Sequence, residues 1–259
     1  MTQPSQVPVR YPSGVTTDNP FQALANYGFR NPFFYHEWED DFSVVSTAYT
    51  KTVTGTGTVA SAAGDGGQAL FTTNATTPLA TDIAAIQLPA AAFSFTAGKK
   101  SFFLSRLWLS DATNAAFIAG LVQTTATPFI VTDGLYFTKA SGTTTVSIVS
   151  AVGSVLTTLA LPAPYSTMAN NTWIDMGWYV DRNQNVKAFI CYPLVGYQLQ
   201  SGSGPVNVSG VTVEPFPGPN ASFAPTLTGA VLNYTLAVQS GTASSKTMTV
   251  DFAMSAKER

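Results

Sequence analysis

The sequence carries few charged residues. Asp, Glu, Lys and Arg together make up 10% of its 259 residues, whereas soluble domains usually contain about 25%. The formal net charge is −2, and the twelve basic residues are scattered along the chain. Because nucleic-acid binding relies on a clustered basic face, we predict no nucleic-acid partner. A weakly charged surface repels its neighbours little, which favours permanent packing against other copies or other subunits.

Cysteine and histidine are almost absent. The one cysteine, Cys191, cannot form an internal disulfide and lies in an apolar, strand-like run. We therefore interpret it as a buried core residue and not as a nucleophilic thiol. The one histidine, His36, is the sole imidazole available for base catalysis or metal binding, and no Gly-x-Ser-x-Gly motif accompanies it. We interpret His36 as a strand-end residue that makes local hydrogen bonds.

Long apolar runs are missing too. No segment approaches the roughly 20 apolar residues that span a bilayer, and residues 1–12 are polar and proline-rich, unlike a signal peptide. We expect no membrane partner and synthesis in a reducing cytoplasm. Five prolines punctuate residues 1–32 and predict an extended N-terminal arm. Two placements of this arm stay open: across a neighbouring subunit, or along its own domain.

From residue 33 onward the pattern is that of β-strands. The even positions of 174–180 are all apolar, which is the period of two of a half-buried strand. A polar turn at 181–185 precedes a second alternating run, so the two form a hairpin. About a dozen such strands, separated by turn signals, predict an all-β fold, an antiparallel β-sandwich of the jelly-roll type. No composition break divides residues 33–259, so we predict a single domain with a Gly/Pro-rich surface excursion at 195–225.

An acidic cluster near the start of this domain is the main candidate for chemistry. Glu37 and Glu39 are two residues apart on a predicted strand, so both point to one face, and paired carboxylates catalyse glycoside hydrolysis. Jelly-roll glucanases space their two Glu further apart, with an Asp between them, whereas only Trp38 separates this pair. We predict no catalytic residue and expect that the chain is not an enzyme.

A cation site is the alternative use of acidic residues. Oxygen ligands for calcium are available from Asp40 and Asp41, with Asp133 or Asp251 as further candidates. No EF-hand spacing supports the site, and these residues would have to converge from distant positions. We therefore predict no metal site and no cofactor.

Tryptophan offers the best candidate for binding. Exposed indoles stack on sugar rings, so Trp38, Trp108, Trp173 and Trp178 are candidates for a carbohydrate platform. Trp178 alternates in phase with apolar neighbours, and Trp108 lies among leucines. We predict that both are core residues.

A set of strand and turn signatures, in a fixed order, suggests a family. The signatures are Glu39-Asp40-Asp41-Phe42, Gly134-Leu135-Tyr136-Phe137, Trp173-Ile174-Asp175-Met176-Gly177 and Met248-Thr249-Val250-Asp251-Phe252. Together they resemble concanavalin A-like or laminin G-like jelly rolls, in particular those among structural proteins of tailed bacteriophages. No family calcium or sugar ligand matches residue by residue, so none is carried over.

The resemblance implies a non-enzymatic virion structural protein. A capsid decoration or cement protein is the favoured form, with the major capsid protein and copies of itself, as a homotrimer, for partners. The alternative is a carbohydrate-binding adhesion module, for which a glycan is the partner. A glucanase-type enzyme ranks third.

Overall fold

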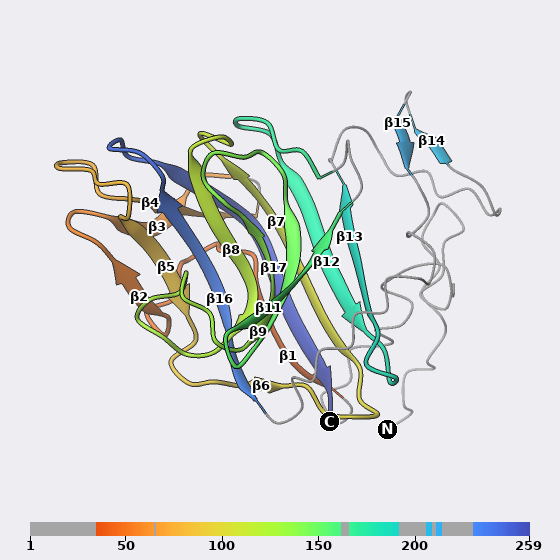
Figure 1. Cartoon of the computed structure of the whole chain (residues 1–259). Coiled ribbons are helices and arrows are strands. Elements are labelled where there is room, and N and C mark those ends of the chain that lie inside the picture. Colours follow the sequence, from red (N-terminus) through yellow and green to blue (C-terminus); the bar gives the residue numbers. More distant parts are fainter. Residues whose placement is uncertain (1–34, 65, 162–165, 192–205, 209–210, 214–229) are drawn as a thin grey trace, which may run out of the picture.

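The computed structural model describes residues 35–64, 66–161, 166–191, 206–208, 211–213 and 230–259 (Figure 1). These residues form strands, turns and loops without any helix, which confirms the predicted all-β class. No helix in this part of the chain could therefore cross a membrane. The predicted arm at 1–32 and most of the excursion at 195–225 lie outside the described residues.

The strands build two antiparallel sheets that face each other as a sandwich (Figure 1). The first sheet has seven strands, and β1 pairs with the second half of its long strand β17. In spatial order its strands are β13 (Val186–Cys191), β12 (Ile174–Val180), β7 (Ser101–Leu109), β17 (Thr247–Glu258), β4 (Gln68–Thr72) and β3 (Thr58–Ala62), with β1 (Tyr35–Asp40) beside β17.

The second sheet has eight strands, and the short strand β6 pairs with the start of β16. Its strands are β11 (Val155–Ala160), β10 (Ser147–Val152), β9 (Gly134–Lys139), β8 (Ala115–Val122), β16 (Val231–Ser240), β5 (Ile83–Gln87) and β2 (Thr50–Val53), with β6 (Phe93–Ser94) beside β16. A separate hairpin is formed by β14 (Val206–Val208) and β15 (Val211–Val213).

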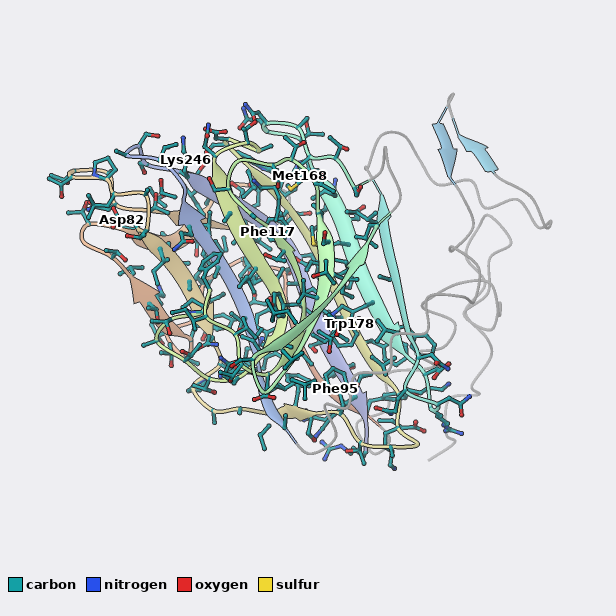
Figure 2. The ribbon with its side chains drawn as sticks, viewed as in Figure 1. Asp82, Phe95, Phe117, Met168, Trp178 and Lys246 are labelled. Carbon is teal, nitrogen blue, oxygen red and sulfur yellow. The ribbon has the colours of Figure 1, made fainter. Side chains whose placement is uncertain are left out.

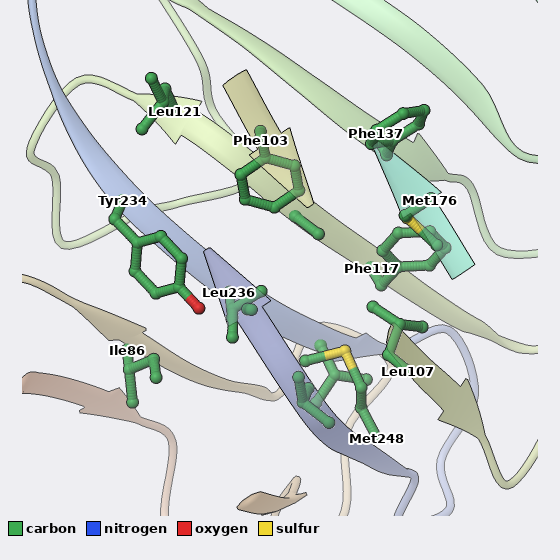
Figure 3. Packing of buried hydrophobic residues seen from close by; sticks show 14 of the residues in the cluster. Ile86, Phe103, Leu107, Phe117, Leu121, Phe137, Met176, Tyr234, Leu236 and Met248 are labelled. Atoms are coloured by element: carbon green, nitrogen blue, oxygen red, sulfur yellow. The ribbon is translucent and has the colours of Figure 1, made fainter. Parts of the chain in front are cut away.

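The core lies between the two sheets and is rich in aromatic side chains (Figure 2). Trp178 is only 1% exposed, as predicted, and its ring stacks on Phe103 with centroids 5.8 Å apart. From the opposite sheet, Phe137 and Tyr234 place their ring centroids 6.4 and 6.3 Å from that of Phe103, and Phe117 belongs to the same core (Figure 3). Burial of these large apolar surfaces is the main driving force for folding, and it holds both sheets as rigid supports for their outer faces.

The β8–β9 loop packs on the outer face of the eight-stranded sheet. Ile118 and Tyr136 point outward from β8 and β9, and they pack against Phe129 and Val131 of the β8–β9 loop. The two strands approach so closely here that a Cβ at Gly120 would lie 2.5 Å from the Cα of Tyr136, which leaves no room for a larger residue. With this face covered, the outer face of the seven-stranded sheet is the better candidate for a binding surface.

Candidate functional site

Five side chains on the outer face of the seven-stranded sheet form what we call the Trp-Arg patch: Arg106, Trp108, Trp173, Asp175 and Asp251. Arg106 and Trp108 alternate along β7 with buried leucines, so they point away from the core. Asp175 on β12 is the register partner of Arg106. On the other side, Asp251 lies at a β-bulge in β17, where the register with β7 shifts. The sheet pairing therefore gathers residues from three strands.

The geometry of the Trp-Arg patch combines aromatic and charged groups. The rings of Trp108 and Trp173 meet edge to face with centroids 6.2 Å apart, and Arg106 Cζ lies 5.2 Å from the centroid of Trp173. Arg106 Nε is 3.7 Å from Asp175 Oδ1, and its Nη1 is 3.6 Å from Asp251 Oδ2. The Arg106 side chain is 38% exposed, so the cluster is held in place yet open to solvent.

The structure corrects the prediction that Trp108 is a core residue. Leu107 and Leu109 fill the core, whereas Trp108 and Leu104 are half-buried on the outer face. The run 102–109 carries apolar residues on both faces of the strand, so its composition did not reveal which face is internal. Arg106, which the sequence reasoning did not single out, is the signal that was missed, because its charge marks the outer face. Trp38 points inward and donates from Nε1 to the hydroxyl of Tyr49 at 3.0 Å.

The acidic residues of β1 point to both faces of this strand. Glu37 and Glu39 share one face of β1, as predicted, and that face is the outer one, opposite Ala256 and Met254 of β17. Asp40 points the other way, and it accepts hydrogen bonds from the Tyr49 hydroxyl and the backbone N–H of Phe42, both at 2.7 Å.

These hydrogen bonds stabilise the turn that follows β1. Phe42 adopts a left-handed φ of 56°, which is costly for a bulky residue, and the bond from its N–H to Asp40 helps to hold it there. Asp41 accepts from the backbone N–H of Ser43 at 3.2 Å. Burial, followed by the hydrogen bond to Asp40, raises the pKa of Tyr49 well above its usual range. Asp40 and Asp41 are therefore structural residues.

The four candidate calcium ligands do not come together. Asp133 lies in the β8–β9 loop over the other sheet and accepts from the backbone N–H of Gly153 at 3.0 Å. Asp251 contacts Arg106 in the Trp-Arg patch. Within the described ranges, no group of three or more His, Cys, Asp or Glu side chains is placed to hold a metal ion.

The predictions for the single histidine and the single cysteine have different outcomes. His36 points to the inner side of β1, where its ring lies 5.1 Å from that of Phe93. Its Nε2 is buried and has no hydrogen-bond partner among the described residues, so the prediction of local hydrogen bonds is wrong for this atom. The backbone of Cys191 ends β13, but its side chain lies outside the described residues, and the prediction that it is buried stays a prediction.

Comparison with known proteins relates the chain by fold and not by sequence. No protein-family model matches it, and no curated protein matches it in sequence. Among solved structures, a protein of unknown function from Shewanella oneidensis MR-1 is similar with a TM-score of 0.54 at 11% identity, covering 93% of this chain and 94% of that one.

Two further structures are similar and have descriptive names. Arcelin-5, a lectin-like defence protein from Phaseolus vulgaris, has a TM-score of 0.53 at 9% identity and covers 87% of this chain and 100% of its own. An endo-1,3-β-glucanase from Streptomyces sioyaensis has a TM-score of 0.50 at 15% identity, with 88% of this chain and 98% of its own covered. At such identities the similarity shows the fold alone.

The glucanase contradicts one prediction. From the spacing of Glu37 and Glu39 we expected that the chain is not an enzyme. The endo-1,3-β-glucanase, which is an enzyme, shares the fold over most of the length of both chains. The resemblance to concanavalin A-like jelly rolls is confirmed, whereas the capsid decoration type within it stays a prediction. The chain is thus a jelly-roll sandwich with the fold of lectin-like proteins and β-glucanases.

Proposed function

We propose that this protein binds carbohydrate at the Trp-Arg patch on the outer face of its seven-stranded sheet. The observation that carries the proposal is the edge-to-face pair of Trp108 and Trp173 beside the guanidinium of Arg106. A pyranose ring has apolar C–H faces and a rim of hydroxyl groups. It therefore needs an apolar ring surface together with hydrogen-bonding groups close by.

The charged members of the patch supply those groups. Arg106 contacts Asp175 and Asp251 at 3.7 and 3.6 Å, which is longer than a hydrogen bond. Its Nε is buried, so its Nη groups are the N–H donors for sugar hydroxyls. Carboxylate oxygens accept from hydroxyls in return. The patch is also pre-organised, because Arg106 lies over Trp173 and between two carboxylates, and little side-chain freedom remains to be lost on binding.

The proteins with a similar fold suggest which oligosaccharides to test first. The fold is shared with a lectin-like protein and with an endo-1,3-β-glucanase, so we start from a β-1,3-glucan hexamer and add β-1,4- and α-linked oligosaccharides. Binding to the full chain is measured by titration calorimetry and by tryptophan fluorescence. We expect Trp173→Ala to weaken binding at least about tenfold, which is about 1.4 kcal/mol.

A matched control removes an aromatic ring elsewhere. Phe129 lies against the outer face of the eight-stranded sheet, so Phe129→Ala should leave the affinity unchanged. Thermal unfolding establishes that both variants are folded. Two results would overturn the proposal: no binding of any oligosaccharide by the unchanged protein, or equal affinity for the unchanged protein and Trp173→Ala.

A second candidate is the structural role in a virion, as a capsid decoration protein that assembles as a trimer on the major capsid protein. The observation that favours it is the edge strand β11, which pairs only with β10 among the described strands. Val155 and Leu156 on this strand are 70% and 57% exposed. Open edges of this kind are templates for association, and the weakly charged surface opposes association little.

This candidate is tested by the mass of the protein in solution. We expect a trimer by light scattering, and Val155→Lys should dissociate it because a charge on the edge opposes pairing. Leu79 is 60% exposed and lies outside the strands, so Leu79→Lys is the control and should leave the trimer intact. A monomer at every concentration, together with no binding to purified capsids, would rule out the decoration role.

A further inference from the structure

A pocket of about 430 Å³ opens at the end of the sandwich where β1 begins and β17 ends. The C label in Figure 1 marks this end of β17. Its volume falls in the range of small-molecule sites. The polar lining comes from β1, the β6–β7 loop and the end of β17: His36, Thr96, Lys99, Lys257, Glu258 and Arg259.

The one side-chain carboxylate in this lining is already neutralised by a residue outside the pocket. Glu258 forms an ion pair with Arg182 at 2.5 Å and accepts from the backbone N–H of Lys100 at 3.1 Å. Arg182 is not part of the lining. Glu258 therefore leaves the three cations of the lining with little compensation.

Two of those cations have neutral partners among the described residues, and the third, Lys99, contacts the end of the chain. Lys257 Nζ donates to the hydroxyl of Ser94 at 3.2 Å, and Arg259 Nε donates to the carbonyl of Tyr35 at 3.2 Å. Lys99 Nζ donates to a backbone oxygen of Arg259, the last residue of the sequence, and in the chain as given this oxygen belongs to the α-carboxylate. No ion pair of Lys257 or of the Arg259 guanidinium occurs among the described residues. The pocket thus concentrates positive charge in a chain whose formal net charge is −2.

The clustering corrects the view that basic residues are scattered. Five of the twelve meet at this end of the sandwich: Lys99, Lys100, Arg182, Lys257 and Arg259. They come from the loop before β7, the turn after β12 and the end of β17, which are neighbouring strands. Separation along the chain concealed a cluster that strand pairing creates.

His36 lies within this field of charge. Burial, and then the positive charges of Lys257 and Arg259, lower the pKa of His36 from its ordinary value of 6.5. The ring packs on Phe93, and its buried Nε2 has no hydrogen-bond partner in the described part of the chain. An anion in the pocket would favour a proton on this imidazole, because it would offset the charge of the two neighbouring cations.

We propose that this pocket binds a small anion, namely a carboxylate or phosphate group carried by a molecule the size of a monosaccharide. Lys and Arg side chains are the usual ligands of both groups, and the hydroxyl of Thr96 adds a donor. The pocket accommodates a compact ligand, in contrast to the extended basic face that a nucleic acid requires. The proposal does not depend on sugar binding at the Trp-Arg patch, which lies toward the other end of β7, about 20 Å away at 3.3 Å per residue.

The experiment uses His36 as the reporter, since it is the only histidine in the chain. Its pKa is measured on the full chain by NMR titration of the imidazole resonance, alone and with glucuronate, glucose 6-phosphate or glucose. We expect either anion to raise the pKa of His36 by about half a pH unit or more, and neutral glucose to leave it unchanged. The anion with the lower Kd identifies the group, and added salt should weaken its binding.

Substitutions test whether the change in the pKa of His36 is caused by an anion bound in the pocket. Lys257→Met should raise the pKa of His36 in the free protein and weaken anion binding at least about tenfold. Lys99→Met, in the β6–β7 loop, should also weaken binding, and thermal unfolding establishes that both variants are folded. Lys51→Met is the matched control, because Lys51 lies on β2 and donates to the carbonyl of Val59, and it should behave like the unchanged protein.

Several outcomes would overturn the proposal. One is a His36 pKa that neither anion changes at millimolar concentration. A second is an equal response to glucose, and a third is undiminished anion binding in both Lys257→Met and Lys99→Met. Tight, salt-dependent binding of a single-stranded oligonucleotide that displaces the anions would assign this end of the sandwich to nucleic acid instead.

Discussion

Lys246 Nζ lies 2.7 Å from Asp111 Oδ2, at the point where the start of β17 meets the turn between β7 and β8. The Lys246 side chain is only 9% exposed. Asp111 also accepts from the backbone N–H groups of Thr113 and Asn114. Burial opposes ionisation of Asp111, but hydrogen bonds from Lys246 and Asn114 outweigh it and lower its pKa overall.

We expect Asp111→Asn to lower the free energy of unfolding at neutral pH by about 2 kcal/mol, a value between those of exposed and buried pairs. The variant leaves the ammonium of Lys246 without its counter-charge. Because the pKa of Asp111 is lower in the folded chain than the 3.8 of an unperturbed Asp, its contribution is present above pH 3.8 and is lost as the pH falls further. Urea unfolding at neutral and acidic pH should show the two proteins converging in acid.

Asp181 provides the matched control for this pair. It accepts from the backbone N–H groups of Asn183 and Asn185 in a similar turn, and no lysine contacts it in the described part of the chain. Asp181→Asn should cost less than about 1 kcal/mol. Equal losses in the two variants would show that turn geometry, and not the ion pair, stabilises the Asp111 turn.

Trp178 and Trp173 should differ sharply when each is truncated. Trp178→Ala removes a fully buried ring from the core, so we expect a loss of about 3 to 5 kcal/mol in the free energy of unfolding. Trp173→Ala removes the same side chain from a half-buried surface position, and about 1 kcal/mol is expected. Urea unfolding followed by circular dichroism measures both, and similar losses would contradict the assignment of Trp173 to the surface.

Buried tyrosines should make the protein sensitive to alkali. Burial raises the pKa of Tyr136 and of Tyr179 to about 12, and it raises that of Tyr234 well above the usual 10. The folded chain keeps these protons while the unfolded chain loses them near pH 10, so the stability is complete below that pH and declines above it.

The alkaline decline is checked by the unfolding temperature at about pH 9 and at about pH 11, together with tyrosinate absorbance. Tyr136→Phe should reduce the decline because it removes one raised pKa. An unchanged unfolding temperature across this range, or ionisation of all ten tyrosines of the folded protein near pH 10, would contradict the burial of these hydroxyls.

The sequence alone predicted the all-β class and about a dozen strands, fewer than the seventeen in the part of the chain that the structure describes. At 174–180 the inward residues are apolar while Asp175 and Gly177 interrupt the outer face, and this local contrast identified Trp178 correctly. At 102–109 apolar residues occupy both faces, so local pattern did not distinguish Trp108 from Leu107. Only pairing with β12 and β17 decided which face of β7 meets the opposite sheet.

Both candidate sites depend on that same tertiary pairing. Arg106, Asp175 and Asp251 are distant in sequence, as are His36, Lys99 and Lys257. Each set is assembled by neighbouring strands: β7, β12 and β17 for the first, and β1, β7 and β17 for the second. The alternation of side chains is a property of each strand by itself, so the chain sequence is enough to predict it. Which strands become neighbours depends on contacts across the whole sandwich, and for that reason only the tertiary structure decided where charge and aromatic surface gather.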